Sequence, residues 1–396
     1  MKLQLIKEKI DQAAGILKEK EIDLWLIFVR ETSVTPDPVM NVVVGTNATW
    51  QSAFLINKNG DTTAIVGSLE VPHMTLVGTY KNVVGYLKSV REPLLDYLIK
   101  HNPGKIAINY SVDSPQADGL THGLYLTLLD IVKETEFKAR LVSSEEIIAA
   151  LRGRKSETEI SIMKQAVKET LKIYDEVTAF MKPGQTEKQV AAFISGKIKE
   201  RGFEPAWDEE HCPAVYSGPE TAGAHSGPTD RIIEKGHIVN MDFGVKINGY
   251  CSDLQRTWYI LRDGETSAPS DVQKGFDVLK EAIRLAKEKV KPGIKGWEVD
   301  NEARSYIVAN GYAEYQHALG HQVGKAAHDG GVGFYPQWER YGKTPFQPIE
   351  IGQIFTIEPR LYVEGKGVVT IEDEIIVTPD GAEYISFPQT ELLLIK

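Results

Sequence analysis

The spacing of apolar residues predicts an α/β arrangement over roughly the first 150 residues. The apolar run at 24–29 is typical of a buried strand, and residues 105–110 indicate another. Residues 54–56 and 62–66 flank a turn at 59–61 and predict a hairpin. A helical face precedes these strands, with apolar residues at three- and four-residue spacing: Leu3, Ile6, Ile10, Ala13 and Leu17. Strands that alternate with helical patterns favour an α/β domain.

A polar, glycine-containing segment at 152–156 separates this part from the rest of the chain. A chain of 396 residues is too long for one typical core, so we expect two domains, 1–152 and 153–396. Ser156 stands where it can cap a following helix, and Glu159 would complete a capping box.

The second part contains an internal repeat. Lys-Pro-Gly at 182–184 and again at 291–293 precedes a helical pattern in which Val and Ile hold the same offsets. The matching positions are Val190, Ile198 and Gly202 in one copy and Val299, Ile307 and Gly311 in the other. The order helix, helix, hairpin occurs twice and predicts a pseudo-twofold domain around one sheet. Coincidence is the competing interpretation, because Lys-Pro-Gly is a common helix stop.

The first hairpin of the repeat carries two aspartates. Asn248-Gly249 joins two strand-like runs, and this dipeptide is a strong hairpin signal because both residues accept positive φ. A two-residue loop would place Asp242 and Asp253 on one face, on the order of 7 Å apart at Cβ. Such a pair is costly without a cation. Solvated edge aspartates, or a salt bridge from Asp253 to Arg256, are the alternatives.

The second hairpin carries two glutamates. A three-residue loop at 364–366 would set Glu358 directly opposite Glu372, whereas a loop of two or four residues would put them on opposite faces. The symmetry of the repeat favours the three-residue loop. Each half would then supply two carboxylates to one side of the sheet.

Three of the nine histidines, His317, His321 and His328, lie between these hairpins and next to glycines. Carboxylates with one imidazole suit divalent ions such as Mn, Co, Zn or Fe. Two such ions about 3.5–4 Å apart activate water and polarise a carbonyl, which is hydrolytic chemistry on an amide or ester. No nucleophilic serine motif of the GxSxG type competes with this interpretation.

Charge and composition narrow the class of partner. The formal net charge of −10 argues against nucleic acid or an anionic membrane, since both require basic patches. The two cysteines form no CxxC motif. The N-terminal residues lack the apolar core of a signal peptide, and the longest apolar run is too short to span a bilayer. A cytoplasmic protein is the simplest expectation.

Five motifs together resemble the Xaa-Pro dipeptidases and aminopeptidases of the pita-bread, or creatinase/aminopeptidase, fold. They are MDFG at Asp242, SDLQRT at Asp253, HALGH at His321, TIEP at Glu358 and IEDE at Glu372. The resemblance covers residues 150–396 well. It implies an α+β chain, with a small creatinase-like α/β domain before a pseudo-twofold pita-bread domain. It also implies a peptide substrate and a homodimer paired through the N-terminal domain.

The resemblance also implies a role for each residue of the site. Asp242 would chelate one ion, Asp253 and Glu372 would bridge two, and His321 and Glu358 would bind the second. Glu358 would also serve as the acid/base.

Other residues of the site would act on the substrate. His328 resembles a histidine that stabilises the tetrahedral intermediate, His225 one near the substrate amine and His317 one that lines the proline pocket. A hydrogen-bonded structural histidine is the alternative for each of these three.

Three positions depart from the family pattern. Gln322 replaces a glycine, Arg360 follows Glu358-Pro359 where glycine is usual, and Thr370 stands where proline-specific members commonly carry arginine. Arg360 could supply that cation and bind substrate. The leading hypothesis is therefore hydrolysis of the N-terminal Xaa-Pro bond of dipeptides or short peptides. The alternatives are a peptidase without proline specificity, or a creatinase-like or other small-molecule hydrolase or lyase on the same fold.

Overall fold

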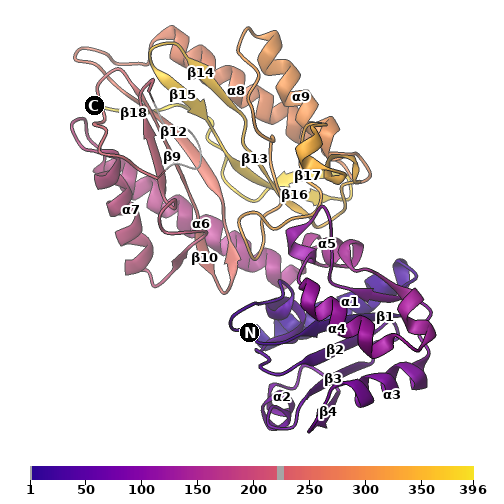
Figure 1. Cartoon of the computed structure of the whole chain (residues 1–396). Helices are drawn as coiled ribbons and strands as arrows, with labels where there is room; N and C mark the ends of the chain where they lie inside the picture. Colours follow the sequence, from indigo (N-terminus) through magenta and orange to yellow (C-terminus); the bar gives the residue numbers. More distant parts are fainter. Residues whose placement is uncertain (1, 221–226) are drawn as a thin grey trace. The chain divides into compact units, whose positions relative to one another are not determined.

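The computed structural model of the chain describes residues 2–220 and 227–396. Contacts divide it into two compact units, Met1–Arg152 and Gly153–Lys396. Figure 1 traces both units along the sequence. None of the helices in the described ranges is long and apolar enough to cross a membrane.

The first unit is built on a mixed six-stranded sheet in the order β4-β3-β2-β1-β5-β6. Its strands are β1 (Leu24–Val29), β2 (Ser52–Asn57), β3 (Thr62–Gly67), β4 (Asn82–Tyr86), β5 (Ile106–Ile108) and β6 (Leu141–Ser143). Its helices are α1 (Lys2–Glu19), α2 (Val71–Val77), α3 (Arg91–His101), α4 (His122–Val132) and α5 (Glu145–Gly153). The expected first helix, the strand at 24–29 and the hairpin are therefore present.

The strand expected at 105–110 is shorter in the structure and ends at Ile108. Its last expected residues leave the sheet because their backbone groups bond elsewhere, and the Asn109 carbonyl accepts from the Leu120 N–H at 2.7 Å. The Asn109 carboxamide accepts from Trp25 Nε1 at 2.7 Å and donates to Asp37 Oδ2 at 2.9 Å. Asn109 thus pairs outside β5 through both its backbone and its side chain, and the ladder stops before it.

The second unit carries helices in two pairs. They are α6 (Glu157–Phe180), α7 (Glu187–Glu200), α8 (Ser270–Lys289) and α9 (Gly296–Ala309). The capping box expected at the start of α6 is present, with Ser156 and Glu159 in reciprocal hydrogen bonds. The helices α7 and α9 each have 14 residues and begin at equivalent positions after their Lys-Pro-Gly segments. Val190, Ile198, Val299 and Ile307 are all buried, so the repeat is structural.

The strands of the second unit form several small sheets rather than the one sheet expected from the repeat. They are β7 (Glu204–Pro205), β8 (Ala214–Ser217), β9 (Ile238–Phe243), β10 (Val245–Ile247), β11 (Tyr250–Cys251), β12 (Leu254–Ile260), β13 (Ile354–Ile357), β14 (Arg360–Val363), β15 (Gly367–Thr370), β16 (Asp373–Thr378), β17 (Gly381–Tyr384) and β18 (Leu393–Ile395). The hydrogen-bonded orders are β11-β10-β7, β18-β12-β9-β8, β13-β16-β17 and β14-β15.

A short bridge between Gln255 and Glu372 joins the two halves of the unit. Pro359 interrupts the second hairpin between β13 and β14, because proline has no N–H to donate to a ladder. The chain therefore turns at Glu358 and again at Glu372. The first hairpin is divided as well, at Gly244 between β9 and β10. The expectation of one sheet was therefore wrong, although the pseudo-twofold order of elements is present.

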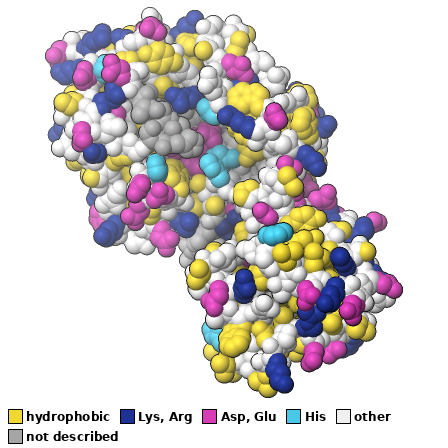
Figure 2. Space-filling view, in the orientation of Figure 1, with side chains coloured by type: hydrophobic (Ala, Val, Ile, Leu, Met, Phe, Trp, Pro, Cys, Tyr) yellow, Lys and Arg dark blue, Asp and Glu magenta, His cyan; other side chains and the backbone are white. Residues whose placement is uncertain are grey.

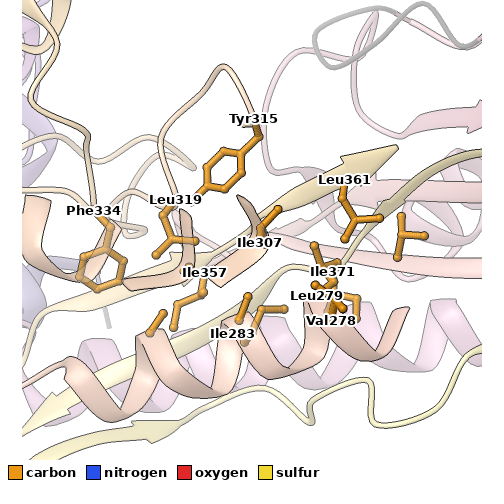
Figure 3. Close-up of a cluster of buried hydrophobic side chains, with 14 of the residues drawn as sticks. Val278, Leu279, Ile283, Ile307, Tyr315, Leu319, Phe334, Ile357, Leu361 and Ile371 are labelled. Carbon is orange, nitrogen blue, oxygen red and sulfur yellow. The ribbon is translucent and has the colours of Figure 1, made fainter. Parts of the chain in front are cut away.

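A hydrophobic core lies between the second pair of helices and the second hairpin. Figure 3 shows Val278, Leu279 and Ile283 of α8 beneath Ile357 and Ile371. These two isoleucines are buried and precede Glu358 and Glu372 directly in the sequence. Burial of the isoleucines anchors the backbone on which both glutamates stand, since neighbouring side chains of an extended chain point to opposite faces.

Candidate metal centre

The first hairpin has the predicted register. Ile247 pairs with Tyr250, and Asp242 pairs with Gln255 further along. Asn248 and Gly249 both have positive φ, at 51° and 81°, as a two-residue loop of this type requires. Asp253 stands two residues before Gln255, so it shares a face with Asp242.

The second hairpin also has the predicted register. Val363 pairs with Gly367, which leaves a loop of three residues, and Ile357 pairs with Asp373 on the far side of the interruption. The same register on both sides sets Glu358 across from Glu372. The three-residue loop that the symmetry of the repeat favoured is therefore the one observed.

Thr356 brings His321 to this hairpin. The backbone N–H of Thr356 donates to the His321 carbonyl at 2.9 Å, and the His321 N–H donates to Thr356 Oγ1 at 3.1 Å. The same Thr356 hydroxyl donates to Glu358 Oε1 at 3.2 Å. One threonine thus holds the histidine and the glutamate side by side. This role was not predicted, because a threonine in a strand is ordinary.

Acidic groups from both hairpins converge on the imidazole of His321. Its Nε2 lies 3.1 Å from Glu358 Oε1, 3.7 Å from Asp253 Oδ2 and 4.0 Å from Glu372 Oε1. Potential ligand atoms of Asp253, His321 and Glu372 all lie within 4.8 Å of one another. Groups far apart in the sequence therefore form one cluster. Figure 2 shows histidine side chains around a recessed patch of acidic ones on the second unit.

The electrostatics of the cluster favour a cation. Burial, followed by the charge of Glu358, raises the pKa of Asp242 to about 7. Burial and neighbouring carboxylates also hold the pKa values of Asp253 and Glu372 well above their usual range. Ionised carboxylates are costly here unless a positive charge compensates them.

The protonation of Glu358 and His321 differs from that of the other acids. Burial opposes the charge on each and is the largest single effect. Their hydrogen bond and mutual charge interaction, together with other polar and charged groups nearby, outweigh it, so the pKa of Glu358 is lowered and that of His321 is raised. The two form an ion pair. A metal ion requires a neutral imidazole, so its binding would displace the proton from His321.

Two buried oxygens are suited to bind such an ion. Among the described residues, Asp242 Oδ1 and Glu372 Oε2 have no hydrogen-bond partner. Buried polar atoms are rarely left without a partner, and an ion is one of the explanations for an exception. Four carboxylates and one imidazole are a donor set that fits Mn, Co, Fe or Zn.

The remaining predicted residues differ in how they relate to this cluster. The His328 ring meets the edge of His321 with centroids 4.2 Å apart. His317 Nδ1 lies 2.7 Å from the Ala318 carbonyl, and its buried Nε2 has no partner among the described residues. Arg360 is half-buried on β14, and burial lowers its pKa. His225 lies outside the described residues.

Arg256 does not form the salt bridge to Asp253 that the sequence left open. Its guanidinium pairs instead with Asp373 at 2.9 Å, and both side chains are buried. It also donates to the Glu372 carbonyl at 2.7 Å. Arg256 therefore holds the backbone of Glu372 from the opposite half of the repeat.

Glu374 holds the backbone of Asp253 in the same way. Its Oε1 accepts from the backbone N–H of Asp253 at 2.6 Å. Neither Glu374 nor Asp373 was predicted to act at the site. The run of acids after Ile371 was the signal that could have indicated them.

Comparison with known proteins places the chain in a family. Residues 161–379 match metallopeptidase family M24. A peptidase of Staphylococcus saprophyticus, itself uncharacterized, is 32% identical over 84% of this chain and 87% of its own length. An Xaa-Pro dipeptidase of Pyrococcus horikoshii is 29% identical over 86% of this chain and 94% of its own.

Solved structures agree on the fold. The Xaa-Pro dipeptidase of Bacillus anthracis superposes with a TM-score of 0.75 at 24% identity, covering 98% of this chain and 100% of that one. The prolidase of Pyrococcus horikoshii gives a TM-score of 0.69 at 27% identity, over 98% of this chain and 100% of that one. The chain belongs to metallopeptidase family M24 and has its pita-bread fold.

Proposed function

We propose that this metallopeptidase hydrolyses the N-terminal Xaa-Pro bond of dipeptides or short peptides with two divalent ions. The observation that carries the proposal is the convergence of carboxylates from two hairpins on His321. Mn, Co, Zn and Fe are the candidate metals. The names of the Pyrococcus horikoshii relatives, an Xaa-Pro dipeptidase and a prolidase, support the choice of substrate.

Each residue of the cluster has a proposed task. Asp242, Asp253, His321, Glu358 and Glu372 would together hold the two ions. Bound ions of this kind supply an activated water and a polarised carbonyl. Glu358 accepts the proton of the attacking water and delivers it to the departing proline nitrogen, which is general acid–base catalysis.

Three further histidines act on the substrate in this proposal. His328, against the ring of His321, donates to the oxygen that becomes negative as the carbonyl is attacked. His317 offers its partnerless Nε2 to the substrate at the proline side. His225 is proposed near the substrate amine on the sequence resemblance alone.

A metal-exchange assay tests the proposed reaction. The purified chain is treated with a chelator, reloaded with Mn²⁺ or Co²⁺, and incubated with Ala-Pro, Ala-Pro-Pro and Ala-Ala. Alanine release from Ala-Pro or Ala-Pro-Pro is expected only after reloading. Metal-dependent cleavage of Ala-Ala at the same rate would favour a peptidase without proline specificity. The absence of metal-dependent alanine release from both proline peptides would contradict the proposal.

Arg360 is the proposed anchor for a carboxylate of the substrate. It is half-buried, none of the acidic residues in the described ranges forms an ion pair with it, and its charge acts on His317. A charge-assisted hydrogen bond contributes about 1.5–3 kcal/mol. Arg360→Met should therefore raise the KM for Ala-Pro by about 10- to 100-fold.

A comparison with a substrate that has an amidated C-terminus distinguishes the loss of a carboxylate anchor from a loss of folding. The KM for Ala-Pro-amide should change little when Arg360 is replaced, because this substrate has no carboxylate to bind. Arg284→Met is the matched control, since Arg284 is an exposed arginine on α8 that pairs with Glu281 and Glu288. Equal losses for both substrates would argue against the carboxylate anchor.

We also propose that the protein is a homodimer and that it is located in the cytoplasm. Leu69, Leu76 and Leu87 of the first unit are more than four-fifths exposed, at 81%, 83% and 83%, and would be covered by a second copy. Both cysteines are free and buried, which suits a reducing compartment. Sedimentation equilibrium tests the dimer, and a monomer at all concentrations would contradict it. Cell fractionation tests the compartment.

A further inference from the structure

Gln255 contacts the candidate metal centre although it is not one of the expected ligands. It stands directly opposite Asp242 across the β9–β12 ladder. Its Nε2 donates to Asp242 Oδ2 at 2.7 Å, and the residue is 7% exposed. One oxygen of the Asp242 carboxylate is therefore already occupied by a neutral donor. The other, Oδ1, is buried and has no partner among the described residues.

Thr370 determines which way the Gln255 amide faces. Its hydroxyl donates to Gln255 Oε1 at 2.7 Å and has a longer contact of 3.2 Å with the Pro359 carbonyl. A hydroxyl has one hydrogen to donate, and the shorter contact is the stronger candidate for it. The Thr370 N–H is bound in turn to Thr257 Oγ1 at 3.2 Å, so the threonine is itself held in place.

The reverse orientation of the amide is unfavourable. It would place Gln255 Oε1 against Asp242 Oδ2, so that two acceptors would face each other in a buried site. The Thr370 hydroxyl would then lose Gln255 Oε1 as its acceptor and would have to donate to the Pro359 carbonyl instead. The observed chain Thr370 to Gln255 to Asp242 therefore has one consistent direction of donation, in which each contact joins a donor to an acceptor.

We infer that Gln255 and Thr370 are positioning residues that orient Asp242 so that its Oδ1 is available to a divalent ion. This inference rests on the proposed function, in which Asp242 is a metal ligand. Partners behind a metal ligand set its orientation, and replacing them typically costs about 10- to 100-fold in metal affinity. Thr370, one of the positions that depart from the family pattern, thus acts on Asp242 through Gln255.

Titration of Mn²⁺ into the chelator-treated full chain by calorimetry tests the inference without any measurement of activity. Thr370→Val keeps the shape of the side chain but removes the hydroxyl, and should weaken one Mn²⁺-binding step by about 10- to 100-fold. Thr370→Ser restores the hydroxyl and should restore the affinity. Gln255→Met removes both amide contacts and should weaken the same step.

The double variant distinguishes a chain of contacts from two separate effects. If Thr370 acts only through Gln255, then Thr370→Val should have no further effect on Mn²⁺ affinity in the Gln255→Met background. Thr79→Val is the matched control, because it removes a buried threonine hydroxyl in the first unit that donates to the Val44 carbonyl. Its Mn²⁺ affinity should equal that of the wild type.

Two results would overturn the inference alone. One is a wild-type Mn²⁺ affinity in Thr370→Val, and the other is additive losses in the double variant. A wild-type chain that binds no Mn²⁺, Co²⁺ or Zn²⁺ would instead contradict the proposed function, and the inference with it.

Discussion

His328 contacts the candidate metal centre without being one of its expected ligands. Its ring meets His321 edge-on at 4.2 Å, so it lies within reach of a substrate bound there. If His328 stabilises the negative oxygen of the intermediate, His328→Ala should lower kcat by about 10²- to 10³-fold. Metal content should stay at the wild-type level, because no ligand is lost.

Steady-state kinetics and metal analysis of the same preparation check this prediction. His101→Ala is the control, since His101 stacks on Tyr97 in the first unit, whereas the residues of the cluster belong to the second. A His328→Ala protein that has lost both metal and activity would show that the histidine supports the ligands rather than the reaction.

The helices α7 and α9 occupy equivalent places in the repeat but begin differently. Thr186 caps α7, and its hydroxyl accepts from the Gln189 N–H at 3.2 Å. Lys295 stands at the equivalent position of α9, and an ammonium group cannot accept a hydrogen bond. Only half of a capping box is present there, in which Glu298 accepts from the Lys295 N–H at 3.1 Å.

Exchanging the caps should change stability in opposite directions. Thr186→Ala is expected to lower the free energy of unfolding by about 1 kcal/mol, and Lys295→Thr to raise it by about 0.5–1 kcal/mol. Urea unfolding of both variants measures these changes, with Thr186→Ser as the control that keeps the hydroxyl. A destabilised Lys295→Thr would show that the lysine side chain contributes more than a cap would.

The register of the two hairpins explains why the positions of the carboxylates could be predicted. Register in a hairpin depends on loop length, and a slip of one residue moves every side chain to the other face. Asn248-Gly249 indicates its own loop length, so Asp242 and Asp253 could be paired from local sequence. The sequence of the loop before Gly367 does not indicate the loop length. Only the symmetry of the repeat favoured the three-residue loop that the structure has.

The stability of the whole molecule should depend on pH, because buried acids of the candidate metal centre destabilise the fold when they are ionised without a cation. The pKa values of Asp242, Asp253 and Glu372 are raised in the folded chain, so the fold binds protons that the unfolded chain releases. The raised pKa of His321 acts in the same sense. Stability of the chelated protein should therefore fall as pH rises from about 5 to about 8. The lowered pKa of Glu358 acts oppositely but is largely expressed at lower pH.

Divalent ions should reverse this loss. At a free Mn²⁺ concentration of about 100 times Kd, mass action adds about 2.7 kcal/mol to the folded state. Calorimetric unfolding of the chelated protein at both pH values, with and without Mn²⁺, measures the effect. The gain in Tm should be larger at the higher pH, because ligands already ionised need release no protons. An unfolding temperature independent of pH and Mn²⁺ would contradict this account of the cluster.

Local sequence was enough to predict most of the elements and the donor set. Periodicity and turn chemistry depend on neighbouring residues, so α1, β1, the capped start of α6, the repeated helices and the Asn-Gly hairpin were all predictable from short stretches of chain. The five acidic and histidine motifs are likewise short and contiguous. Asn109 shows the limit of a local pattern, because its carbonyl bonds to Leu120 instead of a neighbouring strand.

How the halves meet, and which residues stand behind the ligands, depends on the folded chain. Thr356, Arg256, Glu374 and Thr370 act through partners on other elements, and no local pattern marks such contacts. The division into small sheets follows from interruptions of both hairpins, at Gly244 in the first and at Pro359 in the second. Hydrogen bonds across a seam require short distances between segments remote in sequence, and these distances exist only once the chain has folded.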